Sequence, residues 1–188
     1  MIAIVHPQLR AIVEEMDAVS VRLRRLREHA GSERLSLRPQ PQGWSAVECV
    51  VHLNVTSEAF LKVFDRALET APAGENRRHF RRDLIGWLLC KVVEPPARLK
   101  VKTGRAFEPV STPQADEVIG KFLQLQSELS ERIVKAQGYD LQRIRIVSPF
   151  DARVKYNMYS ALCLITAHQR RHLWQAERAV GEAGKSGG

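Results

Sequence analysis

Apolar side chains recur every three or four residues in four long stretches of the chain, which are separated by polar segments. In the first stretch, the apolar positions are Leu9, Ile12, Val13, Met16, Val19, Leu23 and Leu26. Side chains at this spacing share one face of an α-helix. Because Pro7 suits the first turn of a helix and Gly31 suits its end, the pattern predicts a helix over about residues 7–30.

A second helix is predicted to begin after Ser45. Ser45 and Glu48 have the spacing of a capping box, in which each side chain bonds the backbone amide of the other residue. The apolar stripe that follows consists of Val50, Leu53, Phe60, Leu61, Phe64 and Leu68. The pattern predicts a helix to about Thr70, preceded by an irregular connection over residues 32–43. His52 lies on the strip beside the apolar stripe, where it could line a cleft between helices.

The middle of the chain holds one short and one long helical pattern. Residues 84–93 form a short apolar stretch that two consecutive prolines terminate. The apolar positions of the long pattern are Ala115, Val118, Ile119, Phe122, Leu125, Leu129 and Ile133, with the polar Gln126 among them. We expect Thr112 to cap this helix, Pro113 to occupy its first turn and Gly138 to end it.

The last helical pattern follows a return segment over residues 139–154. It extends from about Lys155 to Val180, and one of its faces presents Ala161, Ile165, His168, His172, Gln175, Ala176 and Ala179. Glycine and polar residues dominate the remaining positions, 181–188. This composition predicts a disordered tail.

Four long helical segments, little strand-like alternation and no internal repeat predict an all-α fold, a four-helix bundle. The short stretch near residues 82–93 adds a short extra helix to the bundle. A chain of 188 residues suits one ordinary domain, which buries roughly 70% of the surface of its unfolded state. We therefore expect a single bundle domain over residues 1–180 and a flexible tail over residues 181–188.

Composition narrows the function classes only slightly. No uninterrupted apolar run approaches the ~20 residues that span a bilayer, so we expect a soluble, cytoplasmic protein with no membrane partner. Cys49, Cys90 and Cys163 lie among apolar neighbours and are expected to be reduced core residues. A net charge of +8 is compatible with nucleic acid, with an anionic small molecule or with a basic surface alone. Because no recognisable nucleic-acid module accompanies the arginine-rich runs, nucleic acid is the least favoured partner.

The best clue to chemistry is the pair His168 and His172. Residues four apart lie one above the other on a helix, so both imidazoles can reach one metal ion. Two neutral imidazoles on an inward apolar face would be costly unless something occupied the space between them. A third ligand must come from another helix, and His52 is the candidate. Gln169 stands where a zincin metalloprotease has its general-base glutamate, so a zincin site is not favoured.

The remaining candidate ligands have plainer interpretations. Cys49 precedes His52 by three residues and could be a fourth ligand, but core packing is the default role of a thiol among apolar neighbours. Solvated or capping roles are expected for three histidines in turn-like or helix-end contexts, namely His6, His29 and His79.

No second catalytic group stands out near the histidine pair. Glu48 is explained by capping, and Glu177 lies on a different side of its helix. Arg170 and Arg171 are expected to point outward, although Arg171 could bind a carboxylate at the mouth of a cleft. The tryptophans Trp44 and Trp87 either pack over the bundle or line a pocket, and packing is the expected role.

Two segments, Trp44–Leu53 and Ala167–Glu177, resemble the signature segments of the DinB-like superfamily. The order of elements between them is also similar. The resemblance implies a four-helix bundle with a divalent ion, often zinc or nickel, held by three histidines, which carry over to His52, His168 and His172. Some members attach or use low-molecular-weight thiols such as bacillithiol, mycothiol or glutathione, and others have no established activity.

Three neutral imidazoles would leave a divalent ion its full charge and an open coordination position. Water bound there would lose a proton nearer to neutral pH, and a bound thiol would become a thiolate. We therefore expect an enzyme that uses a small thiol or water on an electrophilic substrate, by transfer or hydrolysis. The alternative is a stress-related or structural bundle, such as a homodimer, that binds metal or a small ligand without turnover. Imidazole suits zinc, nickel, copper and iron alike, so the ligands do not identify the metal.

Overall fold

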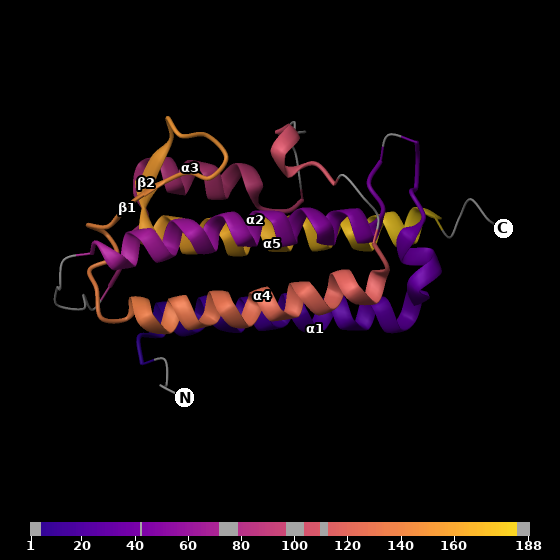
Figure 1. Cartoon of the computed structure of the whole chain (residues 1–188), viewed down its shortest axis with the longest axis horizontal. Helices are drawn as coiled ribbons and strands as arrows, with labels where there is room; N and C mark the ends of the chain where they lie inside the picture. The colour runs from indigo at the N-terminus through magenta and orange to yellow at the C-terminus, as the bar shows by residue number, and fades with distance from the viewer. Residues whose placement is uncertain (1–4, 42, 72–78, 97–103, 110–112, 184–188) are drawn as a thin grey trace.

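Four long helices lie side by side along the molecule, and a shorter helix packs beside them (Figure 1). The computed structural model describes residues 5–41, 43–71, 79–96, 104–109 and 113–183. Its helices are α1 (Pro7–Ser36), α2 (Ala46–Glu69), α3 (Leu84–Val93), the 3₁₀ turn η1 (Arg105–Phe107), α4 (Ala115–Ala136) and α5 (Met158–Ala183). Two strands, β1 (Arg145–Val147) and β2 (Lys155–Asn157), form an antiparallel pair. The predicted all-α bundle with a short extra helix is confirmed.

Helix α5 joins α3 to the rest of the bundle. It packs against α1, α2 and α3, and α4 completes the bundle by packing against α1 and α2. α1 and α5 run in the same direction, since Gln8 bonds Tyr159 near their first turns and Arg22 pairs with Glu177 farther along. α2 and α4 run in the opposite direction (Figure 1). The first and last helices of the bundle are therefore direct neighbours.

The core consists of two apolar clusters that lie in different halves of the bundle. The first includes Leu9, Met16, Phe60, Phe64, Leu129 and Ile165, and the second includes Val19, Leu23, Val50, Leu53, Phe122 and Leu173. Buried polar side chains gather near the boundary between the clusters, namely Ser20, His52, Gln126, His168, Gln169 and His172. A polar layer therefore crosses the middle of the bundle. Among the described residues, no helix is long and apolar enough to cross a membrane.

Helix α1 is longer than the sequence predicted. Gly31 has a positive φ of 73°, which interrupts the regular helix near the predicted end. The chain then resumes a helical course to Ser36, and the side chain of Leu35 is buried in the second apolar cluster. The positive φ of Gly31 therefore kinks α1 without ending it. Burial of the Leu35 side chain favours the further helical turn after the kink.

The ends of α4 and α5 also differ from the predictions. α4 begins at Ala115, so Pro113 precedes the helix and does not occupy its first turn, while Thr112 lies outside the described residues. α5 continues to Ala183, so residues 181–183 of the predicted tail are helical. Residues 184–188 of that tail lie outside the described part of the chain.

A short hairpin replaces part of the predicted return segment and the first turn of the predicted last helix. The pairing of β1 with β2 places Ile146 opposite Tyr156, and both side chains are buried. Strands of three residues show too little alternation to be recognised from their sequence. α5 consequently begins at Met158 and not near Lys155.

One carboxylate, that of Asp83, joins the hairpin to the first turns of α3 and α5. Its Oδ1 accepts hydrogen bonds from the Gly86 amide, at 2.9 Å, and from the Ser160 hydroxyl, at 3.2 Å. Its Oδ2 accepts from the Asn157 amide at 2.7 Å and from the Arg145 guanidinium at 2.8 Å. The helices approach closely here, since a Cβ atom at Gly86 would collide with the side chain of Ser160. Asp83 therefore fixes α3 against the start of α5.

Candidate metal centre

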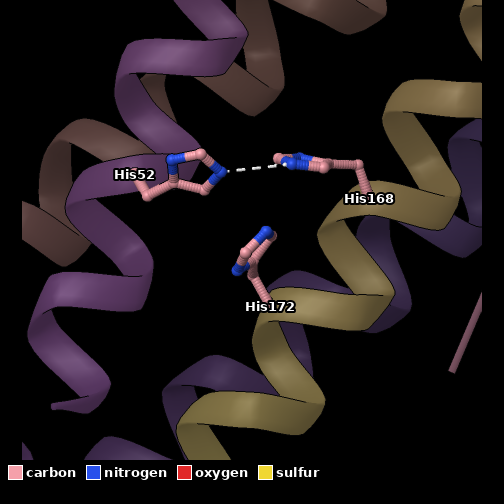
Figure 2. A group of neighbouring side chains, drawn as sticks. All are labelled: His52, His168 and His172. Carbon is pink, nitrogen blue, oxygen red and sulfur yellow. Dashed lines mark hydrogen bonds between the residues drawn. The ribbon is translucent and has the colours of Figure 1, made fainter. Parts of the chain in front are cut away.

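Three histidines meet in the polar layer, where α2 faces α5 (Figure 2). His52 comes from the second turn of α2, and His168 and His172 come from successive turns of α5. One possible ligand atom from each residue lies within 4.8 Å of the others. The ring centroids are 4.4 Å apart for His52 and His172, 4.5 Å for His168 and His172, and 5.0 Å for His52 and His168. The fold thus brings together the three residues that the sequence singled out.

A backbone carbonyl sets the orientation of the His52 ring. Nδ1 of His52 lies 2.7 Å from the carbonyl oxygen of Phe107, at the end of η1. Because a carbonyl oxygen only accepts, Nδ1 carries the proton, and in the neutral imidazole Nε2 carries the lone pair. Nε2 points at Nε2 of His168, 3.2 Å away (Figure 2). A hydrogen bond from one ring nitrogen that orients the other is the usual arrangement around metal-binding histidines.

The three imidazoles are buried and neutral. Their exposed fractions are 3% for His52, 8% for His168 and 7% for His172. Burial lowers the pKa of all three, to about 3 for His168, and the mutual repulsion of the rings lowers the pKa of His168 and His172 further. Nδ1 of His168 and Nδ1 of His172 make no hydrogen bond among the described residues. One nitrogen of each ring converges with the others within 4.8 Å, so the site suits a cation that accepts lone pairs from three neutral imidazoles.

Aromatic rings surround the histidines. The ring of Trp44 lies 5.1 Å from that of His52 and 6.0 Å from that of His172. The ring of Phe150 lies 5.7 Å from that of His168 and 4.9 Å from that of Phe107. Trp44 therefore lines the site, beyond the packing role that was expected. Sequence analysis missed both phenylalanines, and the only signal for Phe150 was its place in the return segment.

A glutamine pair explains two polar residues of the core. Nε2 of Gln169 donates to Oε1 of Gln126 at 2.6 Å, and Nε2 of Gln126 donates to the carbonyl oxygen of Met16 at 3.0 Å. This network links α5 through α4 to α1. It accounts for Gln126, the polar exception in the predicted apolar stripe of α4. It also turns Gln169 toward α4, which agrees with the exclusion of a zincin site.

Cys49 and Arg171 are both buried. Cys49 is 1% exposed within the second apolar cluster, and burial raises the pKa of its thiol to about 12. It lies outside the group of three converging ligand atoms, and core packing is its role. Arg171 does not point outward as expected, because it is 7% exposed and donates to the carbonyl oxygen of Val92 at 3.1 Å. Its positive charge lies close enough to lower the pKa values of His168 and His172.

The other charged candidates of the last helix are engaged in ion pairs. Arg170 pairs with Glu15 and Glu94, and Glu177 pairs with Arg22. The histidines outside the trio contact other groups, since the ring of His6 stacks on Phe80 and Nδ1 of His29 bonds a backbone carbonyl. These contacts leave His52, His168 and His172 as the converging group among the described residues.

The start of α2, which positions both Trp44 and His52, is held by the predicted capping box. Ser45 Oγ accepts from the Glu48 amide at 3.2 Å, and Glu48 Oε2 accepts from the Ser45 amide at 2.8 Å. Glu48 also forms a two-point ion pair with Arg38. The carboxylate is buried, so each of these hydrogen bonds offsets the cost of removing a charge from water.

Glu48→Gln is expected to destabilise the protein by about 1–3 kcal/mol at neutral pH. Burial alone would raise the pKa of Glu48, but hydrogen bonds from Arg38 and Ser45 outweigh it and lower the pKa. Its contribution is complete above the unfolded-state pKa, about 4.3, and is lost as pH falls through the folded-state pKa.

Urea unfolding of both proteins at pH 7 and near pH 3 measures this difference. The gap in unfolding free energy between the two proteins should shrink at the lower pH, and a gap independent of pH would contradict the role of the carboxylate. Glu58→Gln is the matched control on the same helix, because Glu58 forms an exposed ion pair with Lys121 and should contribute less than about 1 kcal/mol.

Comparison with known proteins adds one finding. The model of the DinB superfamily matches residues 14–176, which include all three histidines. No curated protein and no solved structure matches the chain. The family match covers most of the bundle and agrees with the resemblance of the two histidine-bearing segments. On this evidence, the chain belongs to the DinB superfamily.

Proposed function

We propose that His52, His168 and His172 hold a divalent metal ion and that the protein is a metal-dependent enzyme acting on a small thiol or water. The observation that carries the proposal is the convergence of three neutral imidazoles, with ligand atoms within 4.8 Å of one another. Three protein ligands leave a coordination position for a further ligand, as catalytic sites do. Zinc or nickel is the proposed ion.

The residues around the trio have roles that support this proposal. The Phe107 carbonyl holds the His52 ring so that its Nε2 lone pair faces the other histidines. His168 and His172 each offer a further converging nitrogen from α5. Because burial keeps all three imidazoles neutral, they bind a cation without first losing a proton.

The same surroundings favour an anionic ligand beside the trio. A divalent ion held by three neutral histidines supplies a Lewis acid that favours the deprotonated form of a thiol or of water. Arg171 adds a second positive charge close to His168 and His172 and favours the same form. Trp44 and Phe150 provide apolar surface for an electrophilic substrate. We therefore propose S-transfer from a low-molecular-weight thiol, or hydrolysis, as the reaction.

A second candidate is metal binding without turnover. This candidate is favoured because two carboxylates already bind other partners. Glu48 caps α2 and pairs with Arg38, and Glu177 pairs with Arg22. In the described part of the chain, no carboxylate joins the three histidines. General acid–base catalysis by a side chain would then be lacking.

Elemental analysis of untagged protein tests the metal site. The parent protein is expected to carry about one equivalent of zinc or nickel after reconstitution, and the variant with His168→Ala and His172→Ala is expected to carry none. Loss of two of three ligands leaves a single imidazole, which holds a divalent ion weakly. Thiol-dependent turnover of electrophilic substrates, measured with and without the metal, then separates the enzyme from the binding protein.

Two further variants make the outcome specific. His29→Ala removes an exposed histidine of α1 that is not part of the converging group and should leave metal content unchanged. His52→Gln removes a ligand while keeping a polar side chain of similar size, and circular dichroism confirms its fold. Metal retained at one equivalent in the folded His52→Gln and double-alanine proteins would overturn the proposed site.

A further inference from the structure

The outer face of α3 is apolar and exposed to solvent. The exposed fractions are 78% for Leu84, 44% for Ile85, 43% for Trp87 and 55% for Leu88. These four positions share one side of the helix, and Gly86 on the opposite side packs against the first turn of α5. α3 lies outside the four long helices of the bundle (Figure 1). Its apolar face therefore points away from the core.

This face is the main concentration of exposed apolar side chains in the described part of the chain. Nine large apolar side chains are exposed there, and four of them lie within five consecutive positions of α3. The others are spread over α1, the residues beside its two ends, and the hairpin. Trp87, which was expected to pack over the bundle, is half exposed instead. Isolated exposed apolar residues are ordinary, whereas a contiguous patch marks an interaction surface.

Positive charge flanks the apolar face at both ends. Lys91 lies on the same side of α3, seven positions after Leu84, and its Nζ is 5.1 Å from the centre of the Trp87 ring. Arg81 and Arg82 are exposed and come just before the helix. Their backbones lie within roughly 11 Å of that of Leu84, because only three positions separate the farther one from it. A partner on this face therefore also meets basic side chains.

The acidic residues beside α3 are already engaged. Asp83 caps the helix and pairs with Arg145, and Glu94 pairs with Arg170. The sequence shows the same imbalance, since residues 77–105 hold nine lysines and arginines but two acidic residues, and so contribute seven of the net charge of +8. The segment that contains α3 therefore attracts an anionic partner.

We propose that α3 binds the surface of an anionic membrane. Its apolar face would lie at the boundary between headgroups and acyl chains, and its flanking basic side chains at the lipid phosphates. Helices that bind in this way carry Trp and Leu on one face and Lys or Arg beside it. Lys91 can lay its stem along the Trp87 ring and keep its ammonium group among the phosphates. No membrane partner was expected because no segment is long enough to span a bilayer, but a helix that lies on the surface needs no such length.

Other partners match these features less well. Contact between two copies of this face would bring like charges together. In addition, a helix of ten residues is about 15 Å long and about 10 Å wide, and it offers much less than the roughly 800 Å² that each partner of a stable dimer buries. A nucleic acid would use the basic side chains but leave the leucines uncovered. A lipid surface uses both and needs no groove, because lipids adapt to a convex helix.

Co-sedimentation with large unilamellar vesicles tests the proposal. The protein is expected to bind vesicles of phosphatidylcholine that contain about 30% phosphatidylglycerol, and to bind pure phosphatidylcholine at least about tenfold more weakly. Raising the salt concentration to about 0.5 M should release most of the bound protein, because salt screens the attraction between the charges. Equal binding to both kinds of vesicle, or no binding to the anionic vesicles, would overturn the proposal.

Variants identify the surface that binds. Leu84→Ser combined with Leu88→Ser should weaken binding to the anionic vesicles at least about tenfold, and Lys91→Gln should weaken it roughly threefold to fivefold. The matched controls are Leu37→Ser, which changes a half-exposed leucine after α1, and Lys62→Gln, which changes an exposed lysine of α2. Neither control should alter binding. Unchanged affinity of the double-serine protein, with its fold confirmed by circular dichroism, would contradict the proposal.

Analytical ultracentrifugation distinguishes a lipid surface from a second copy of the chain. The parent and the double-serine protein should have the same oligomeric state. A dimer that the serine substitutions dissociate would mean that a second copy covers α3, and the proposed membrane surface would be wrong. The variant with His168→Ala and His172→Ala should bind vesicles as the parent does, because the face of α3 contains neither histidine. Failure of the metal site and failure of the membrane surface are therefore distinguishable.

Discussion

Zinc added to the metal-free protein is expected to raise the midpoint of thermal unfolding by about 5–15 °C. A ligand that binds only the folded state at 100 to 1,000 times its Kd adds roughly 2.7–4.1 kcal/mol, and each kcal/mol is worth about 2–4 °C for a chain of this size. The effect should be large here because the three nitrogens come from two helices and meet only in the folded bundle. Calorimetry with and without zinc or nickel measures the shift.

The histidine variants determine what the shift means. His172→Ala should abolish it, because the variant lacks one of the three converging nitrogens. Added metal should raise the unfolding midpoint of His29→Ala by as much as it raises that of the parent. An equal increase in the unfolding midpoint of the parent and of His172→Ala would mean that the metal binds elsewhere. The proposed metal site would then be wrong.

Asp83→Ala is expected to destabilise the protein by about 3–4 kcal/mol. The carboxylate caps α3 through the Gly86 amide and also holds the Asn157 amide and the Arg145 guanidinium. Truncation removes the cap and leaves the Asn157 amide, at the hairpin end of α5, without its partner. Urea unfolding measures the loss in free energy of unfolding.

Asp151→Ala is the control for Asp83. Among the described residues, the carboxylate of Asp151 bonds only Arg153, and this exposed pair should contribute less than about 1 kcal/mol. If Asp83→Ala lowered the free energy of unfolding as little as Asp151→Ala does, the packing of Gly86 against Ser160 would be sufficient to fix α3. The carboxylate of Asp83 would then be dispensable.

The long helices could be predicted because their period repeats over many turns. The capping box at Ser45 and Glu48 was equally visible, since both partners lie within one turn. The pairing of His168 with His172 follows from spacing along one helix. The role of His52 could not be predicted in this way, because the sequence of α2 does not indicate which helix His52 faces. The family resemblance supplied that information.

Features that depend on contacts between distant segments escaped prediction. The Phe107 carbonyl that orients His52 is a backbone group, and its residue type carries no signal. Asp83 was assigned no role from the sequence, and its carboxylate bonds groups 62 to 77 positions away. Arg171 was expected to point outward because charged residues usually do, whereas the carbonyl of Val92 on α3 provides a buried partner. In each case, the deciding partner is remote in sequence.

The neighbouring positions of α1 and α5 have a consequence for biosynthesis. Of the five helices, α5 leaves the ribosome last, yet it packs against α1, α2 and α3. The apolar stripes of the earlier helices therefore stay uncovered during most of translation, when nascent chains are prone to aggregate and need chaperones. Joining the first helix to the last also closes a loop of nearly the whole chain, which slows folding. Since two of the three histidines lie on α5, an unfinished chain has neither a closed core nor a complete trio.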